Sequence, residues 1–270
     1  MLPTVKNLLL EEAGDTLTIW LNRPETRNAL SQAMADELAE VFEALPGEPY
    51  RFVVLRGRGG SFCSGGDLKM FRSVFQAGAP REDIVAFNAD FGRMMGAIRR
   101  LPQLFIVAIE GFAMAGGLGI ACLADVVATV ADARFALTEV TLGIPPAQIT
   151  PVVIRRIGAS QARRLLLTAQ RFDGNEAHRL GFAHFVEPDR EALDERICSL
   201  LHEARKGAPG AIALTKDIIN ASAELEEQAL VQFAAERFAD AMLGDEAREG
   251  MAAFAEKRST SWASAGEVET

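Results

Sequence analysis

Residues 104–130 read LFIVAIEGFAMAGGLGIACLADVVATV, and the pattern of this segment indicates the fold class. It begins with an apolar run at 104–109, passes through a glycine cluster at 111–119 and a short helical stretch, and ends in a second apolar run at 125–130. Continuous apolar runs of this length are typical of strands covered on both faces, and a helical connection between two of them is typical of parallel pairing. The stretch therefore predicts an α/β domain with mostly parallel strands.

The N-terminal part of the chain continues this alternation of strands and helices. Residues 7–11 and 15–21 are short apolar runs on either side of a glycine turn, which predicts a hairpin. Residues 31–45 and 83–101 carry apolar side chains at helical spacing, whereas 51–55 (RFVVL) is typical of a buried strand. The order of these segments again favours a sheet with helical connections.

Beyond about residue 155 the pattern is almost entirely helical. Asp173-Gly-Asn-Glu176 is typical of a capping-box helix start, and Gly181 of a helix end. Residues 183–187 are the remaining strand candidate, and residues 224–257 form a strongly amphipathic segment. This last segment fits a helical layer on the same core and a subunit interface equally well.

Composition excludes several classes of protein. The 270 residues include 37 Asp and Glu against 28 Lys and Arg, a net charge of −9, and 49% are hydrophobic. Such a chain buries a full core and is not largely disordered. The acidic balance argues against a duplex nucleic-acid binder, which carries a basic footprint. It leaves room for an anionic small ligand, because a local basic patch is enough.

The cysteines and the longest apolar stretch point to a cytoplasmic protein. The three cysteines are far apart in the chain, so neither a disulfide framework nor a Cys-rich zinc site is predicted, and a reducing cytosol fits. The N-terminus shows no signal-peptide pattern. Between Glu110 and Asp125 lie 14 uncharged residues, fewer than the roughly 20 that a spanning helix needs, so no membrane association is expected.

Several common catalytic patterns are absent. The three histidines all lie late in the chain, no G-x-S-x-G elbow accompanies them, and no H-E-x-x-H zinc motif is present, so no metal site is predicted. The glycine-rich loop at 60–67 lacks the Lys-Ser/Thr of a P-loop. Gly117-x-Gly119 lacks the third glycine of a dinucleotide fingerprint.

Two glycine clusters and one glutamate remain as candidate chemistry. Each cluster follows a buried strand, where free backbone N–H groups can point at a developing oxyanion; tight turns between buried elements are the alternative. Glu139 lies among apolar residues, where burial raises the pKa of a carboxyl group toward that of a useful acid–base catalyst. The alternative is a surface or salt-bridged glutamate.

Four ordered motifs resemble the enoyl-CoA hydratase/isomerase (crotonase) family, over roughly residues 7–260. They are N-R-P-x-x-x-N-A-L at 22–30, F-C-S-G-G-D-L at 62–68, A-G-G-L-G-I-A-x-x-A-D at 115–125 and F-x-L-T-E-V-x-L-G-I at 135–144. The resemblance implies an α/β spiral of repeated ββα units with an α-helical C-terminal region. Residues 1–200 would form the spiral core with the oxyanion loops and the acid–base glutamate. Residues 201–270 would serve oligomerisation and cover the active site, in a homotrimer or a dimer of trimers.

The resemblance also implies the residues of the site. The two backbone donors that stabilise an enolate-like oxyanion on an acyl-CoA thioester correspond to Gly66 and Gly116, and the acid–base carboxylate to Glu139. No metal is implied, and no cofactor beyond the coenzyme A moiety of the substrate. Positions that correspond to substrate or CoA binding are Arg27, Ala29, Ser64, Gly65, Asp67, Leu68, Gly117, Gly119 and Lys257.

One departure from the family concerns its second glutamate. Hydratases with two glutamates carry one of them where this chain has Gly119. Three outcomes fit a single carboxylate: an isomerase that moves one proton between C2 and C4, a hydratase that uses Glu139 alone, or a substrate that supplies its own carboxylate. A glycine at 119 would also leave room for a bulky 3-substituent or a distal carboxylate of the substrate.

A second departure favours one substrate class. Residues 144–158 (IPPAQITPVVIRRIG) resemble the bacterial branch of 3-methylglutaconyl-CoA and isohexenylglutaconyl-CoA hydratases, whose members can also lack the first glutamate. We therefore expect a hydro-lyase that adds water across the 2,3 double bond of a branched enoyl-CoA, in acyclic terpene or leucine catabolism. The alternatives are a Δ3,Δ2-enoyl-CoA isomerase and a non-catalytic acyl-CoA-binding relative. Candidate residues for the acyl pocket, each also a candidate packing residue, are Phe71, Phe75, Phe87 and Phe91.

Overall fold

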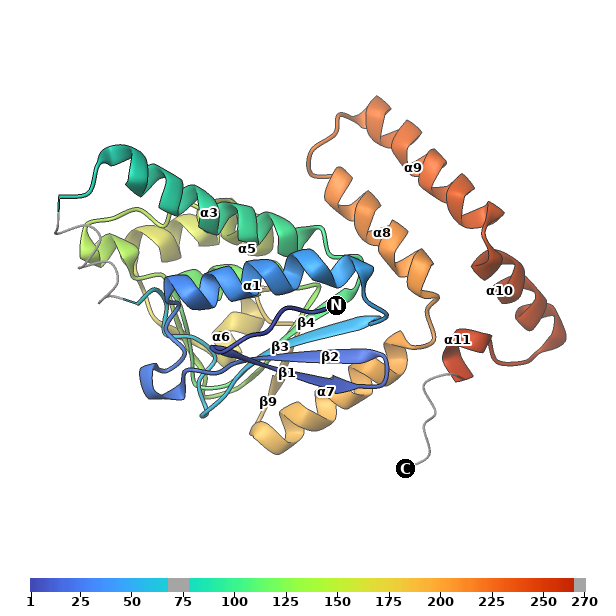
Figure 1. Cartoon of the computed structure of the whole chain (residues 1–270), viewed down its shortest axis with the longest axis horizontal. Helices are drawn as coiled ribbons and strands as arrows, with labels where there is room; N and C mark the ends of the chain where they lie inside the picture. Colours follow the sequence, from blue (N-terminus) through green and yellow to red (C-terminus); the bar gives the residue numbers. More distant parts are fainter. Residues whose placement is uncertain (68–77, 265–270) are drawn as a thin grey trace.

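The main sheet has six strands in the order β1-β2-β3-β4-β6-β9 (Figure 1). The computed structural model that shows it describes residues 1–67 and 78–264. The β1–β2 pair is antiparallel, and the pairs from β2 to β9 are parallel, which confirms the predicted fold class. The strands are β1 (Leu8–Ala13), β2 (Thr16–Leu21), β3 (Phe52–Gly57), β4 (Leu104–Ile109), β6 (Val126–Val130) and β9 (Phe185–Glu187).

Helices lie on both sides of this sheet. Figure 1 shows α1 and α3 on one side and α7 on the other. Because its neighbours cover both faces, β3 is buried at every residue. The core between α1 and the sheet includes an edge-to-face pair of aromatic rings, Phe42 and Phe105, with centroids 5.6 Å apart.

A second, smaller sheet makes the chain a spiral. It has the order β5-β7-β8, formed by Phe112–Met114, Arg134–Ala136 and Phe172–Asp173. The chain passes from a strand of the main sheet to a short strand of the small sheet and then into a helix, first through β4, β5 and α4 and again through β6, β7 and α5. These repeats are the ββα units that the resemblance implied.

The helices follow the predicted apolar spacing closely. They are α1 (Gln32–Ala44), α3 (Arg81–Arg99), α4 (Ala115–Ala121), α5 (Thr150–Thr168), α6 (Gly174–Arg179), α7 (Arg190–Ala204), α8 (Pro209–Ala221), α9 (Glu227–Leu243), α10 (Asp245–Glu256) and α11 (Ser261–Ser264). The predicted start of α6 is confirmed, since the Asp173 carboxylate accepts a hydrogen bond from the Glu176 N–H at 2.9 Å. Gly181 follows the helix with a φ of +76°. Within residues 1–67 and 78–264, none of the helices combines the length and the hydropathy of a membrane-spanning segment.

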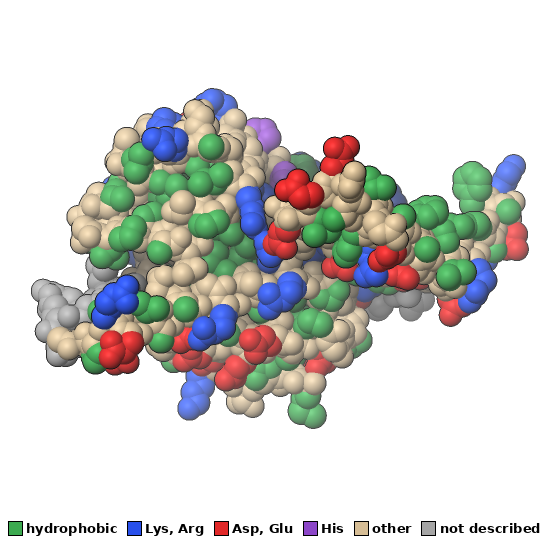
Figure 2. All heavy atoms as spheres, turned by 90° about the horizontal axis from the view of Figure 1, so that it is seen from above, with side chains coloured by type: hydrophobic (Ala, Val, Ile, Leu, Met, Phe, Trp, Pro, Cys, Tyr) green, Lys and Arg blue, Asp and Glu red, His purple; other side chains and the backbone are tan. Residues whose placement is uncertain are grey.

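The C-terminal arm, α8 to α10, projects from the body of the molecule (Figure 1). The amphipathic segment 224–257 is two helices rather than one, because the chain turns at Gly244. No residue of α9 is buried in the single chain. Figure 2 shows apolar side chains on the arm among charged ones, and the most exposed large ones are Val231, Phe238, Leu243 and Phe254.

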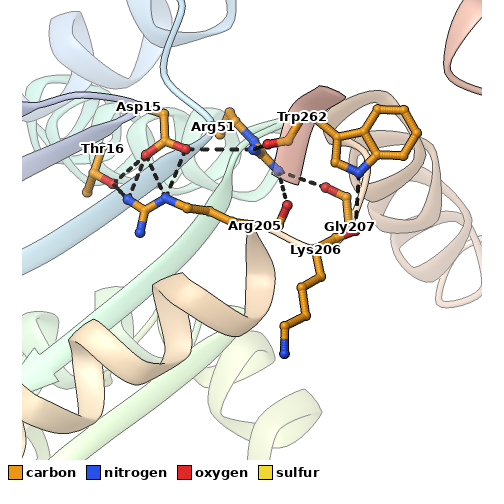
Figure 3. Close-up of polar contacts among 7 residues, drawn as sticks. All are labelled: Asp15, Thr16, Arg51, Arg205, Lys206, Gly207 and Trp262. Carbon is orange, nitrogen blue, oxygen red and sulfur yellow. Dashed lines mark hydrogen bonds and ion pairs between the residues drawn. The ribbon is translucent and has the colours of Figure 1, made fainter. Parts of the chain in front are cut away.

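A polar cluster fastens the arm to the sheet (Figure 3). This hinge cluster consists of Asp15, Arg51, Arg205, Gly207 and Trp262. The Arg51 guanidinium donates to the carbonyls of Trp262 at 2.9 Å, Gly207 at 2.7 Å and Arg205 at 3.2 Å. Arg205 in turn donates to the Asp15 carboxylate at 2.7 Å. The start of β2, the end of α7 and the C-terminal turn are thereby joined at one point.

Candidate active site

The first glycine loop carries a backbone N–H that has no partner in the described part of the chain. The Leu30 N–H donates to the Gly65 carbonyl at 2.8 Å, and the Asp67 N–H donates to the Leu30 carbonyl at 2.9 Å. Because an extended backbone alternates its polar groups, the N–H of the intervening Gly66 points away from Leu30. It forms no hydrogen bond with any residue in the described ranges.

The second candidate donor lies in the first turn of α4. Gly116 is the second residue of this helix, and the N-cap residue Met114 makes no side-chain capping bond. The first N–H groups of a helix lack partners within it, and the helix dipole makes them favourable for negative charge. No residue in the ranges 1–67 and 78–264 accepts a hydrogen bond from the Gly116 N–H, which can therefore receive a ligand oxygen.

The two loops lie side by side. The Cys63 N–H donates to the Phe112 carbonyl at 2.8 Å, and the Met114 N–H donates to the Cys63 carbonyl at 2.9 Å. The contact leaves no room for a side chain at Gly117, where an added Cβ would lie 2.5 Å from the Cβ of Cys63. Gly117 is thus a packing residue between the two loops.

Glu139 begins η3 (Glu139–Leu142), directly beyond the small sheet. Its side chain is half-buried, and its Oε2 atom is buried without a hydrogen-bond partner among the described residues. Burial raises the pKa of this carboxyl group, and a backbone hydrogen bond within the residue opposes the rise. Among the described residues, Glu139 has no salt-bridge partner.

Aromatic and aliphatic side chains flank the second donor. A Cβ at Gly116 would lie 3.3 Å from Cδ1 of Leu30 and 3.4 Å from the ring of Phe91. Phe91 is half-buried on α3, as is Phe87. Two further candidates for the pocket, Phe71 and Phe75, lie outside the described residues. The fold brings Phe91, one of the two described candidates, beside an oxyanion loop.

The space beside Gly119 is filled, contrary to expectation. A Cβ at this position would lie 2.1 Å from Cγ2 and 2.7 Å from Cβ of Ile149, which is itself 3% exposed. The glycine therefore leaves no room for a substrate substituent. The sequence pattern did not indicate this contact, because thirty positions separate the two residues.

Several candidate CoA-binding residues hold each other in place. The Ser64 hydroxyl donates to the Thr26 carbonyl at 3.1 Å. The Arg23 guanidinium donates to the Ala29 carbonyl at 2.6 Å and to the Asp67 carboxylate at 3.2 Å. These contacts fix the loop and leave Ser64 and Asp67 engaged within the protein. Gly65, in the left-handed region with a φ of +96°, faces the start of α4, and Leu68 lies outside the described residues.

Arg27 differs from these residues because its charge is available. Its side chain is exposed, and its guanidinium lies over the ring of Phe112 at 5.3 Å. It forms no ion pair with a described residue. Lys257 is also exposed, but it ends α10 in the C-terminal arm. Figure 1 shows α10 well apart from α3 and α5, so a single chain does not bring Lys257 to the site.

Asn28 is a structural residue that the sequence analysis did not single out. It is fully buried, with a φ of +56°. Its side chain donates to the carbonyls of Arg58 at 2.9 Å and Ser61 at 2.7 Å, and accepts from the Arg23 N–H at 2.8 Å. It thereby joins the 22–30 loop to the first glycine loop. The signal was its place in the first motif, since asparagine tolerates the left-handed region.

Comparisons with known proteins agree with this geometry. The family model described as enoyl-CoA hydratase/isomerase matches residues 11–265. The structure of Pseudomonas aeruginosa AtuE is 47% identical, with a TM-score of 0.92, and the match covers 96% of this chain and 100% of that one. An enoyl-CoA hydratase/isomerase from Marinobacter aquaeolei is 41% identical, with a TM-score of 0.90 over 95% of this chain and 99% of that one.

A relative that is named as an enoyl-CoA hydratase supports the same family. The enoyl-CoA hydratase ACTT6 of Alternaria alternata is 33% identical over 91% of this chain and 80% of its own length. The model match and these similarities span nearly the whole chain, including both glycine loops and Glu139. The chain therefore belongs to the enoyl-CoA hydratase/isomerase family and is an enzyme of the enoyl-CoA hydratase type.

Proposed function

We propose that this enzyme adds water across the 2,3 double bond of a 3-substituted glutaconyl-CoA, with Glu139 as its one acid–base carboxylate. The observation that carries the proposal is the buried Oε2 of Glu139, which has no hydrogen-bond partner among the described residues. The two adjoining loops each offer a backbone N–H that is likewise unpaired within the described ranges. An unpaired buried carboxylate oxygen costs free energy, and a group that receives a substrate or water explains its retention.

The proposed reaction follows from these groups. The N–H groups of Gly66 and Gly116 polarise the thioester carbonyl, and each such donor is worth about 10²–10³ in rate. Glu139 takes a proton from water as its oxygen attacks C3, and an enolate-like oxyanion forms between the two donors. The protonated carboxyl group then returns the proton to C2, which restores both the thioester and the base.

The proposed substrate class rests on the sequence around the start of α5 and on the packing of Ile149 against Gly119. Residues 144–158 resemble the glutaconyl-CoA hydratase branch. Ile149 fills the position at which a second glutamate would begin. A reaction that uses one protein carboxylate is consistent with a substrate that carries a carboxylate of its own. The pathways would be those of acyclic terpene or leucine breakdown.

A Δ3,Δ2-enoyl-CoA isomerase is the second candidate, and the same observation favours it. One carboxylate suffices to move a proton between C2 and C4, and no water needs to be activated. A non-catalytic acyl-CoA binder is less consistent with the site, because such a protein gains nothing from a carboxylate whose pKa burial has raised.

We also propose that the enzyme is a homotrimer or a dimer of trimers. The exposed apolar side chains of α9 and α10 would pack on a neighbouring copy, and Lys257 would reach the CoA phosphates of that copy's site. Arg27 would bind the same anionic cofactor from within its own chain. Light scattering of the purified protein should give a mass of three or six chains, and a monomer at micromolar concentration would contradict this arrangement.

Mass spectrometry of a CoA-ester panel in deuterated buffer tests the reaction. The panel holds crotonyl-CoA, a 3-enoyl-CoA, 3-methylglutaconyl-CoA and isohexenylglutaconyl-CoA. Water addition restricted to the glutaconyl esters supports the proposal and identifies the substrate. A moved double bond in the 3-enoyl ester, with deuterium uptake and no water added to any ester, makes the enzyme an isomerase. Binding without any turnover overturns both.

A further inference from the structure

The segment that carries Glu139 is compact but largely exposed. Between η3 and α5, the Ile144 N–H donates to the Glu139 carbonyl at 3.3 Å, and the Thr150 N–H donates to the Pro146 carbonyl at 3.1 Å. These bonds make residues 139–150 a self-contained turn. Most of its side chains face solvent and contribute little to holding it, and the exposed ones are Val140, Thr141, Leu142, Ile144, Pro145 and Ala147.

Gln148 joins this segment to α3. Its side-chain amide donates to the Asn88 Oδ1 at 2.8 Å. The helix approaches so closely that a Cβ at Gly92 would lie 2.5 Å from the Oε1 of Gln148. Since α3 also carries Phe91, this bond ties the glutamate segment to the apolar side of the site.

Ile149 joins the same segment to α4. Its side chain is buried over Gly119, one helical turn beyond the donor Gly116. Two consecutive residues therefore hold the segment from two directions, one by a hydrogen bond and one by an aliphatic contact that only a glycine at 119 permits.

We infer that Gln148 and Ile149 are positioning residues for Glu139. They fix the exposed segment against α3 and α4, and so set the position of the carboxylate relative to the backbone donor on α4. The inference rests on the proposed role of Glu139 as the acid–base group. Ile149 is the main anchor, because it is buried and its side chain occupies the place that the Cβ of any larger residue at position 119 would take.

Truncation of Ile149 tests this role against a matched control. Ile149→Ala should lower kcat by about tenfold to a hundredfold with little change in KM, because displacing a catalytic group by about 1 Å costs up to 10²-fold in rate. Ile149→Val should keep most of the activity, since valine retains the Cγ2 and Cβ atoms that lie over Gly119. Gln148→Met, which keeps the length and loses the bond, should cost about fivefold.

Substitution on α4 approaches the same contact from the other side. Gly119→Ala should displace Ile149 and lower kcat in the same way. Adding Ile149→Gly to Gly119→Ala should restore part of the lost kcat. In that double variant the nearest remaining atom of residue 149, its Cα, lies 3.7 Å from the new Cβ. Adding Ile149→Ala should restore less, since its Cβ stays 2.7 Å away.

Hydrogen exchange of the full-length protein gives a readout that does not depend on the reaction. The peptide covering residues 139–150 should exchange faster in Ile149→Ala than in Ile149→Val, with the sheet unchanged. Unchanged exchange there, or a kcat within twofold of wild type in folded Ile149→Ala, overturns the inference. The kcat comparison can be made with whichever reaction the wild type catalyses, hydration or isomerisation. The product that the wild type forms tests the hydratase proposal separately.

Discussion

Gly117→Ala should damage the site although no polar group is removed. The new methyl group would lie 2.5 Å from the Cβ and 2.6 Å from the Sγ of Cys63, well inside van der Waals contact. Both atoms belong to the segment that leads into the first glycine loop, and Gly116 is the adjacent residue. The substitution therefore pushes the two oxyanion loops apart.

The size of the effect follows from this overlap. Relieving an overlap of about 1 Å in a packed core costs about 1–3 kcal/mol, and alanine in a helix returns about 1 kcal/mol, so the net loss of stability is about 0–2 kcal/mol. The effect on catalysis is larger. A shift of about 1 Å between the N–H groups of Gly66 and Gly116, which are proposed to bind the same oxygen, should lower the rate about 10²-fold.

Steady-state kinetics and thermal melting separate these two effects. Gly117→Ala should melt within a few degrees of wild type and lose most of its kcat, whereas Gly47→Ala, which meets no atom within 4 Å, should change neither. Adding Cys63→Gly should recover activity, but adding Cys63→Ala should not, because its Cβ stays in place. A kcat within twofold of wild type for Gly117→Ala would show that this contact does not set the spacing of the two oxyanion loops.

Three further predictions concern charge. Burial raises the pKa of Glu139, so this carboxylate is protonated at a higher pH than an exposed glutamate. The acid limb of the kcat–pH profile should therefore have its inflection above the ordinary glutamate pKa of about 4.3. An inflection below that value is inconsistent with the site. Arg51→Met removes three hydrogen bonds from the hinge cluster and should lower Tm by about 5–10 °C. Arg248→Met, on an exposed ion pair, should lower Tm by less than about 2 °C, and equal shifts would argue against the hinge. Arg27→Ala should raise KM for the CoA ester by about tenfold at unchanged kcat, and less at high salt, in initial-rate measurements; an unchanged KM removes Arg27 from the CoA site.

The parallel sheet and most helices were predictable because their signals are local. A run such as 104–109 is apolar throughout since both faces of its strand are covered, and the start of α6 is specified by Asp173 and Glu176 within one turn. The small sheet was missed, because strands of two or three residues, such as 112–114, leave no periodic pattern. The break at Gly244 was missed for a similar reason, since the apolar spacing continues on both sides of it.

In the candidate site, too, the features with local sequence signals were predictable and the long-range contacts were not. The motifs located Glu139 and both glycine loops, because those residues are specified by type and by short-range order. The contact of Ile149 with Gly119 was not predictable, and the expected free space turned out to be filled. A glycine in a sequence shows only that a side chain is missing. Whether the space is open depends on residues that the fold brings in from elsewhere.

The role of Glu139 is best measured by incubating wild type and Glu139→Gln with 3-methylglutaconyl-CoA in deuterated buffer and following the products by mass spectrometry. We expect the wild type to add one water with deuterium at C2, and a folded Glu139→Gln variant to do so at least about 10²-fold more slowly. Equal rates of water addition by the two proteins would contradict the assignment of Glu139. Deuterium uptake with a moved double bond and no added water would contradict the hydratase itself.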